Sequence, residues 1–261
     1  MKKMIIGNWK LNPTRLKEAV SFLAKIENYL KKNKSGSEIV IAPPYVYLES
    51  LISASAAAKG YGGLRFASQN VFWEEKGAFT GEISPKMLKN LGVEYAIIGH
   101  SERRKYAAET DEMINKKVKA ALNEGLKAVL CVGEPLEVRK KGKKAAMNFV
   151  KNQLQKDLKG IKKLSIVGRG LLVIAYEPVW SISTSGTGLV CSPDDALEMI
   201  KYIKKLLTTN YQPLTPRVLY GGSVNNKNIQ GFLKHNEIDG ALVGGASINA
   251  KEFKKIVELT I

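Results

Sequence analysis

Eight short apolar runs recur along this chain of 261 residues, and segments with helical periodicity separate them. The runs are rich in β-branched residues, which is typical of strands buried on both faces of a parallel sheet. They cover Met4–Ile6, Ile39–Ala42, Leu64–Ala67, Tyr95–Ile98, Ala128–Val132, Leu171–Ala175, Val218–Tyr220 and Ala241–Val243. Strands that alternate with helices in this way predict an α/β fold with a parallel sheet.

Two of the segments between the runs show an apolar helical face most clearly. The first face would consist of Ala19, Val20, Leu23, Ile26 and Leu30, and the second of Ala196, Met199, Ile200, Ile203, Leu206 and Leu207. One helix is predicted to start at Pro193, with Ser192 before it as the cap. Another is predicted to start near Asn225, with Ser223 before it. Because no linker or change in composition divides the chain, we expect a single (β/α)8 barrel catalytic domain over residues 1–261 rather than a doubly wound open sheet.

Composition narrows the class of function. No apolar segment approaches the roughly 18 residues that cross a bilayer, and the first apolar run is too short for a signal peptide, so we expect a cytoplasmic protein without membrane contact. Cys131 and Cys191 have no metal-ligand spacing and are expected to be reduced thiols. Lysine and arginine outnumber aspartate and glutamate by 41 to 24, but they are scattered along helices. The densest run, Arg139–Lys144, lacks interleaved aromatics, which argues against nucleic acid as a partner.

The stretch from Leu171 to Gly188 contains the strongest functional signal. Its buried strand is followed by an ionisable Glu177, then by Pro178 and a polar tract that contains glycine. The proline ring restricts the residue before it to an extended backbone, and the small residues beyond allow movement. We interpret residues 181–192 as a lid beside a carboxylate. The alternative is an ordinary strand-to-helix loop whose glutamate pairs with a lysine.

Other polar residues follow the predicted strands in the same way. In a barrel, the loops after the strands lie on one rim, where functional residues collect. These positions hold Gly7–Lys10, Gly99–Arg104, Glu177, Gly221–Ser223 and Gly244–Ser247. Residues far apart in the sequence would therefore converge on one pocket.

The glycine pairs after the last two strands suit an anion. Gly221-Gly222 and Gly244-Gly245 can bring backbone N–H groups close to ligand oxygens, because no Cβ intervenes. A helix start after Gly245 would add its dipole. Tight turns that merely need glycine are the alternative at both places.

His100, one of two histidines, follows a buried strand and precedes Ser101-Glu102, which resembles the capped start of a short helix. A helix N-terminus disfavours the imidazolium ion, so we expect a neutral His100 that donates a hydrogen bond. The other histidine, His235, lies on a lysine-bearing helical stretch and is expected to be a solvated surface residue.

Lys10 would add a positive charge to this pocket and Asn8 an amide donor. With Glu177 as base and His100 as neutral donor, the set suits proton abstraction next to a carbonyl in a small phosphorylated substrate. The same donors would stabilise the enediolate electrostatically. The sequence contains no metal-ligand cluster and no dinucleotide fingerprint, so we expect no metal and no cofactor.

Eight motifs resemble those of the triosephosphate isomerase family, nearly from end to end. They are Asn8-Trp9-Lys10, Gln69-Asn70, Gly77–Glu82, Gly99–Arg104, Cys131–Glu134, Ala175–Trp180, Tyr220–Val224 and Leu242–Ser247. The resemblance implies a TIM barrel without a cofactor. It also implies interconversion of dihydroxyacetone phosphate and D-glyceraldehyde 3-phosphate through an enediolate, in glycolysis and gluconeogenesis.

The resemblance further implies a role for each site residue. Glu177 would be the base that moves a proton between two carbons, and His100 the neutral electrophile. Lys10 and Asn8 would hold the substrate, and Glu102 would be a supporting carboxylate near Lys10 and His100. Phosphate would be bound by the backbone of Ser183, Ser223, Gly244 and Gly245.

The lid departs from the family pattern, because it is a few residues longer than is usual there. Its Pro178-Val179-Trp180 hinge is intact. The N–H group that caps the phosphate is that of Ser183 if the lid is aligned from its left end, and that of Gly186 if it is aligned from its right. The sequence leaves this choice open.

The long tract from Gln69 to Ser84 carries Phe72, Trp73 and Phe79 among glycines. Exposed aromatics on a loop suggest a partner surface. Since the family it resembles is dimeric, we expect a homodimer through the 69–84 loop, with Thr80 near the partner's Lys10. A loop folded onto its own barrel is the alternative.

Two other functions stay open at this point. One is a different phosphate-binding barrel enzyme, such as an aldolase or a sugar epimerase. An aldolase would use a Schiff-base lysine on a middle strand, whereas the strand ends offer only Lys10. The other is a non-catalytic protein that binds nucleic acid through its basic surface.

Overall fold

The computed structural model describes residues 2–33, 36–55, 64–161, 171–183, 185–210 and 216–260. Residue 184 of the predicted lid lies outside these ranges. The strands are β1 (Met4–Asn8), β2 (Glu38–Ala42), β3 (Leu64–Ser68), β4 (Tyr95–Ile98), β5 (Lys127–Val132), β6 (Leu172–Tyr176), β7 (Arg217–Tyr220) and β8 (Gly240–Val243). The helices are α1 (Leu16–Lys32), α2 (Tyr45–Ala54), α3 (Pro85–Asn90), α4 (Ser101–Tyr106), α5 (Asp111–Asn123), α6 (Leu136–Arg139), α7 (Lys143–Asp157), α9 (Pro193–Asn210), α10 (Ile229–Leu233) and α11 (Ala250–Glu258), with short 3-10 helices η2 (Val179–Ser181) and η3 (Gly245–Ile248).

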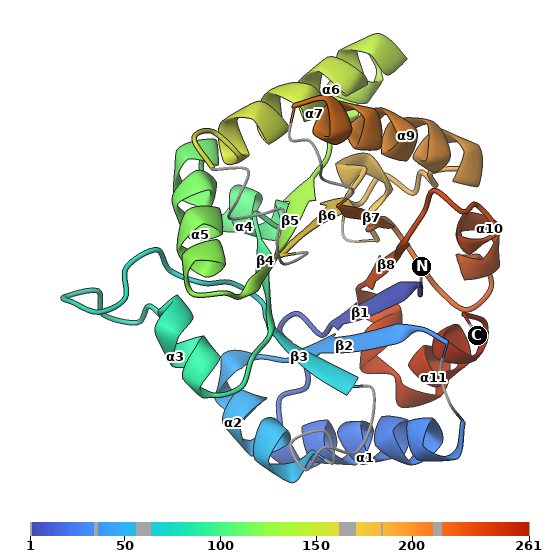
Figure 1. Cartoon of the computed structure of the whole chain (residues 1–261). Helices are drawn as coiled ribbons and strands as arrows, with labels where there is room; N and C mark the ends of the chain where they lie inside the picture. The colour runs from blue at the N-terminus through green and yellow to red at the C-terminus, as the bar shows by residue number, and fades with distance from the viewer. Residues whose placement is uncertain are drawn as a thin grey trace.

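The strands form one closed parallel barrel in the order β1 to β8, and β8 pairs with β1. Figure 1 shows the strands around the centre and the helices around the outside. The predicted α/β fold and closed barrel are confirmed. None of the helices in the described ranges is long and apolar enough to span a membrane.

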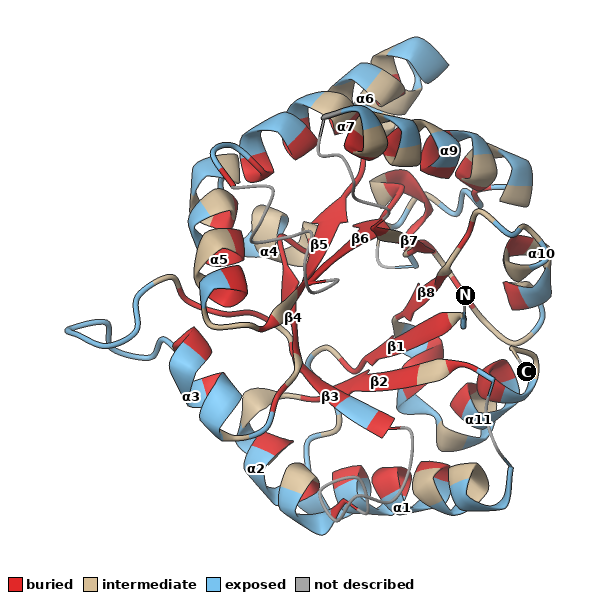
Figure 2. Cartoon of the chain, viewed as in Figure 1, coloured by how far each residue is buried: buried red, intermediate tan, exposed pale blue. Residues whose placement is uncertain are grey.

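Two apolar clusters explain why the strand sequences read as continuous apolar runs. Side chains that alternate along the strands fill the barrel interior; they are Met4, Ile6, Val40, Ala42, Ala67, Tyr95, Ile97, Val129, Cys131, Val173, Ala175, Leu219 and Leu242. The residues between them, such as Ile5, Ile39 and Ile174, pack outward against the helices. Both faces of the strands are therefore buried along most of their length, as Figure 2 shows, and Arg65 on β3 is an exposed exception. This burial explains why the predicted runs show no polar alternation.

Some predicted boundaries were wrong. Several strands extend beyond the apolar runs, and in β1 the residues Gly7 and Asn8 end the strand instead of opening the loop after it. On α1, Val20 is 37% exposed, while Phe22 is buried in its place. Val20 stands at the edge of the apolar stripe, where helical periodicity alone does not decide which neighbour faces the core.

The two predicted helix starts had different outcomes. Ser192 caps α9 as predicted, since its Oγ accepts the N–H of Asp195 at 3.1 Å. Ser223 does not cap a helix, because its hydroxyl donates to the carbonyl of Ser181 at 2.8 Å and α10 begins only at Ile229. Asn225 instead organises a turn before α10, with Oδ1 accepting the N–H of Lys227 at 2.8 Å.

Candidate active site

Most of the rim residues selected from the sequence line one cavity of about 200 Å³. They come from the ends of β1, β4, β6, β7 and β8, which the closed barrel brings together. The lining of the cavity includes Asn8, Lys10, His100, Glu177, Ile182, Ser183, Gly221, Gly222, Ser223, Gly244 and Gly245. Glu102 does not line it but lines a neighbouring pocket, and reaches the cavity through its contact with Lys10. The predicted convergence is therefore present.

Glu177 follows β6 and is only 2% exposed. Its Oε2 accepts the backbone N–H of Ser101 at 3.1 Å, while its Oε1 lies 3.3 Å from Nε2 of His100. This Oε1 is buried and forms no hydrogen bond with any described residue. This oxygen is therefore available to accept a proton from a molecule bound in the cavity.

His100 caps the helix that begins beside it. Its Nδ1 accepts the N–H of Glu102 at 3.2 Å, so this nitrogen carries no proton. The neutral ring then has its single N–H at Nε2, on the side that faces Glu177. This arrangement supports the neutral donor predicted from the sequence.

Lys10 is held in a left-handed backbone conformation, with φ of 55°. Its N–H donates to Oδ1 of Asn8 at 3.0 Å, and its carbonyl accepts Nε2 of Gln69 at 2.9 Å. The Nζ atom lies 2.6 Å from Oε1 of Glu102. Such a conformation costs a non-glycine residue about 1 to 2 kcal/mol, so these contacts fix the ammonium at the cost of local strain.

The glycines of the cavity serve two different purposes. A Cβ at Gly222 would lie 2.2 Å from Oη of Tyr220, and one at Gly221 would lie 2.9 Å from Cγ of Glu177. These two positions need glycine because the chain itself packs closely there. At Gly245, in contrast, a Cβ would meet nothing within 4 Å. The open space beside the Gly245 backbone, at the start of η3, is room that an anion can occupy.

Sequence reasoning missed the role of Glu134, a buried carboxylate directly after β5. Its Oε1 accepts Nε1–H of Trp180 at 2.8 Å and Oη–H of Tyr176 at 3.1 Å, and its carbonyl accepts the N–H of Val179 at 3.1 Å. Burial raises the pKa of this carboxyl above its usual value, although these hydrogen bonds oppose the shift. Glu134 thus anchors the lid hinge. The sequence did contain a signal for this role, because Glu134, like Glu177, is an ionisable residue that follows a buried strand.

Hydrogen bonds join the two ends of the lid to each other and to the loop after β7. The Oγ of Ser181 accepts the N–H of Cys191 at 2.8 Å. The carbonyl of Ser181 accepts both the hydroxyl of Ser223, at 2.8 Å, and its N–H, at 3.2 Å. The lid is therefore tied to a residue that lines the cavity.

The middle of the lid carries its own hydroxyl network. Ser185 Oγ and Thr187 Oγ1 both donate to the carbonyl of Trp180, and the N–H of Ser185 donates to the carbonyl of Ile182 at 2.8 Å. Ser183 lines the cavity, whereas Gly186 is not among its lining residues. The placement favours Ser183 for the phosphate contact, which stays a prediction.

We expect the double substitution S185A/T187V to raise KM by about three- to tenfold and to lower kcat by less than that. Each lost hydrogen bond is worth about 1 kcal/mol, and a loosened lid must be ordered again when substrate binds. Steady-state kinetics will measure the effect. The matched variant S185T/T187S keeps both hydroxyls and should behave as the parent does; equal losses in the two variants would contradict this role.

Arg104 ties the His100 segment to the outer helices. Its Nε donates to the carbonyl of Gly99 at 3.1 Å, and its two terminal nitrogens lie 2.6 Å from Asp111 Oδ1 and 2.8 Å from Asp157 Oδ2. Asp157 is fully buried at the end of α7, and its Oδ1 has no hydrogen-bond partner among the described residues. Burial raises the pKa of Asp157 to about 7 despite the guanidinium of Arg104.

This raised pKa predicts a stability that falls as pH rises. Between the ordinary carboxyl pKa and about 7, folded Asp157 binds more protons than the unfolded chain does, so the free energy of unfolding decreases across that window. The decrease is on the order of 4 kcal/mol at most. Denaturant unfolding from pH 4 to pH 8 should show this decrease in the free energy of unfolding for the parent, and the decrease should be absent from D157N. Identical pH profiles of the two proteins would refute the assignment.

The loop between β3 and α3 projects from the barrel in Figure 1. Its end residue Ser84 caps α3, where Oγ accepts the N–H of Met87 at 3.2 Å. The prediction of three exposed aromatics was wrong in part: Phe72 is buried and stacks on Trp73, with ring centroids 4.1 Å apart. Phe79 is 43% exposed, and its ring centroid lies 4.9 Å from that of Phe72. Phe72 is therefore buried between two aromatic neighbours, and Phe79 is the exposed member of the group.

Two other predictions concern single residues. His235 lies in the turn after α10 and is half-buried, with Nε2 buried and without a partner among the described residues, so the solvated helical position was wrong. The carbonyl of His235 accepts Nζ of Lys3 at 3.0 Å, which holds the turn against the barrel. Cys131 and Cys191 are both free thiols, as predicted, and burial raises the pKa of each.

The fold and the cavity define a barrel enzyme that can hold a small phosphorylated compound between a carboxylate, a neutral imidazole and an ammonium group. A family model described as Triosephosphate isomerase matches residues 3–260. Curated relatives of that name are 47% identical in Caldanaerobacter subterraneus subsp. tengcongensis and 45% in Thermoanaerobacter pseudethanolicus, each over 98% of both chains. One from Dictyoglomus thermophilum is 45% identical over 98% of this chain and 99% of its own. The chain belongs to the triosephosphate isomerase family. It is therefore an isomerase of a phosphorylated triose, not an aldolase or an epimerase.

Proposed function

We propose that the chain interconverts dihydroxyacetone phosphate and D-glyceraldehyde 3-phosphate, as a step of glycolysis and gluconeogenesis. The observation that supports this most strongly is the pairing of Glu177 with His100 across 3.3 Å, on a cavity that also contains Lys10 and the glycine pair Gly244-Gly245. These groups supply the base, the donor, the cation and the anion site that the reaction needs.

In the proposed reaction, the Glu177 carboxylate removes a proton from the carbon next to the carbonyl. The electron pair of that C–H bond forms the carbon–carbon double bond of an enediolate, and the carbonyl oxygen becomes negatively charged. Nε2–H of His100 and Nζ of Lys10 stabilise this oxygen. Glu177 then returns the proton to the neighbouring carbon, and the hydroxyl proton of the enediolate passes from the first oxygen to the second through Nε2 of His100. The aldehyde and the new hydroxyl group are thereby completed, and no atom is gained or lost. Glu102 supports Lys10 through its 2.6 Å contact.

The phosphate group is proposed to lie against the backbone of Gly244, Gly245 and Ser223, with Asn8 at the side of the substrate. Because Ser183 lines the same cavity from the lid, its N–H would complete the phosphate site. Closing the lid would exclude water, which strengthens each electrostatic contact and protects the enediolate from side reactions.

A coupled assay tests the proposal directly. The purified protein should convert each triose phosphate into the other, as followed by a dehydrogenase that oxidises or reduces NADH with only one of them. Inorganic phosphate should compete, raising KM without changing kcat, because it occupies the glycine-lined site. An absence of conversion, or inhibition that lowers kcat alone, would count against the proposed function.

We propose a homodimer through the 69–84 loop, in which Thr80 lies near the partner's Lys10. The exposed Phe79 on the projecting loop supports this, since a solvent-facing aromatic on a protruding loop is a common partner anchor. F79E should shift sedimentation from dimer to monomer and reduce activity at least tenfold, since a buried charge costs several kcal/mol. V20E, a change on exposed α1, is the matched control. A dimeric F79E protein would exclude this interface.

We further propose that residues 1–261 act as one catalytic domain in the cytoplasm. The closed barrel and the family match over residues 3–260 support the first part. The two buried free thiols support the second, because a reducing compartment keeps such groups unpaired.

A further inference from the structure

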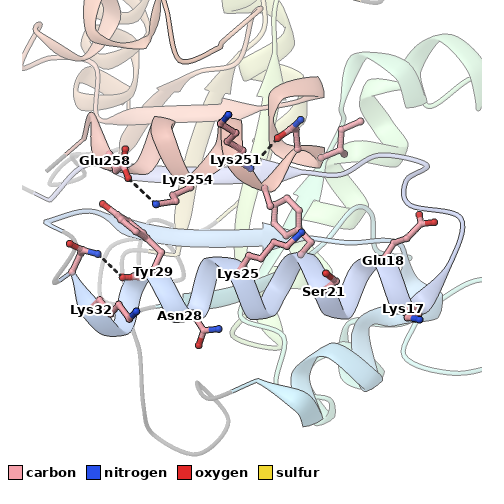
Figure 3. Close-up of a pocket in the computed structure, with 15 residues that line it drawn as sticks. Lys17, Glu18, Ser21, Lys25, Asn28, Tyr29, Lys32, Lys251, Lys254 and Glu258 are labelled. Atoms are coloured by element: carbon pink, nitrogen blue, oxygen red, sulfur yellow. Dashed lines mark hydrogen bonds and ion pairs between the residues drawn. The ribbon is translucent and has the colours of Figure 1, made fainter.

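A long groove runs between α1 and α11 on the outer surface of the barrel, away from the substrate cavity. Its volume is about 1160 Å³. Figure 3 shows side chains of both helices along it, from Lys17 and Lys32 on α1 to Lys251 and Lys254 on α11. None of the functions proposed above uses this groove.

Positive charge dominates the rims. Five lysines and two glutamates line the groove, and the lysines are Lys17, Lys25, Lys32, Lys251 and Lys254. Glu258 lies 3.5 Å from Lys254, which leaves the other four lysines without an ion pair among the described residues. Lys17, Lys25 and Lys32 stand within about 80° of one another around α1, given 100° per residue. The groove therefore presents a row of unneutralised ammonium groups.

Apolar surface lies between the charged rims. Phe22 is 7% exposed and Ile248 is 43% exposed, and both line the groove. The ring of Tyr29 is covered by the ammonium of Lys254, 5.0 Å from the ring centroid. An occupant should therefore carry apolar side chains as well as negative charge.

These features favour one kind of partner. Binding of single-stranded nucleic acid usually depends on aromatic rings that are free to stack on bases. Two aromatic residues are among the described residues that line the groove. Phe22 is buried, and the ring of Tyr29 is already covered by the ammonium group of Lys254. A second copy of this chain would bring a net charge of +17 to a basic surface. Neither objection applies to an acidic peptide.

We propose that the groove between α1 and α11 binds an extended acidic peptide segment whose alternate side chains are apolar. The 17 residues of α1 span about 25 Å, which an extended segment of roughly eight residues matches. In an extended chain, alternate side chains point to opposite sides. Leucine-like side chains can therefore contact Ile248, which is 43% exposed, while carboxylates reach the lysines of the rims.

Fluorescence anisotropy with a labelled octapeptide of alternating glutamate and leucine tests the proposal on the full-length protein. We expect saturable binding that weakens as salt rises from 50 to 300 mM, because exposed charges are screened within about 10 Å at 0.1 M. K25E/K251E should weaken binding about tenfold, as two attractive sites become repulsive. K25R/K251R keeps the charges and should bind as the parent does.

The control variant K144E/K205E changes the net charge equally, at exposed positions on α7 and α9, which lie across the barrel from α1 in Figure 1. It should retain binding, and all variants should keep the parent's unfolding midpoint and isomerase activity. Equal losses in the groove and control variants would overturn the proposal. So would the absence of binding at millimolar protein, or tighter binding of an eight-nucleotide thymidine strand. Because isomerase activity is measured separately, failure here leaves the proposed function intact.

Discussion

Replacing Glu177 with glutamine should lower kcat by about 10⁴-fold. The amide has nearly the same shape as the carboxylate, but it cannot accept a proton from carbon. KM should change little, because binding depends on the ammonium and the backbone N–H groups. The coupled assay of isomerisation measures both constants.

The variant E177D provides the matched control. It keeps the charge but withdraws the carboxylate by about one bond, so turnover should fall by roughly 10² through misplacement alone. If E177Q retained activity within tenfold of the parent, Glu177 would not be the base. A graded loss, smaller for aspartate than for glutamine, separates the chemical role of the group from its position.

Replacing Lys10 with methionine should lower kcat/KM by about 10³-fold. The substitution keeps the apolar stem and removes the ammonium, so Glu102 loses a partner now 2.6 Å away. The loss should appear in kcat as well as KM, because the charge on the substrate oxygen grows toward the enediolate. Steady-state kinetics at fixed ionic strength give the comparison, with K144M as the control for net charge.

Lys10→Gly separates charge from backbone strain. Glycine adopts φ of 55° without the penalty that Lys10 bears, so K10G should lose activity as K10M does and yet unfold at a higher denaturant concentration than K10M. Activity in either variant within tenfold of the parent would remove Lys10 from the site. A K10G protein less stable than K10M would show that the lysine conformation is not strained.

The barrel was predictable from the sequence because burial on both strand faces leaves a direct trace. A strand such as Leu171–Ala175 shows no polar alternation, and eight such runs in βα alternation allow few topologies. The rim residues were predictable for a related reason. A polar residue directly after an apolar run, such as His100 or Glu177, lies at the carboxyl end of a strand whatever its distance in sequence from the others.

Other features depend on contacts that no local pattern encodes. Val20 and Phe22 lie about 160° apart around α1, at opposite edges of its apolar stripe, and the elements that pack against the helix decide which of the two is buried. Ser223 has the composition of a helix cap, but tertiary structure directs its hydroxyl to Ser181 instead. The anchoring role of Glu134 needs the indole N–H of Trp180, which arrives from another strand end.

The hydroxyl and the N–H of Ser223 both donate to the carbonyl of Ser181, and these bonds affect how a phosphate group can bind. The N–H proposed to bind phosphate is already engaged with the lid, and one N–H makes one strong hydrogen bond at a time. A phosphate that takes this N–H leaves the carbonyl of Ser181 with the hydroxyl of Ser223 as its remaining donor from that residue. Part of the binding energy of the phosphate is therefore spent on exchanging this hydrogen bond, so that filling of the phosphate site and the position of the lid are coupled.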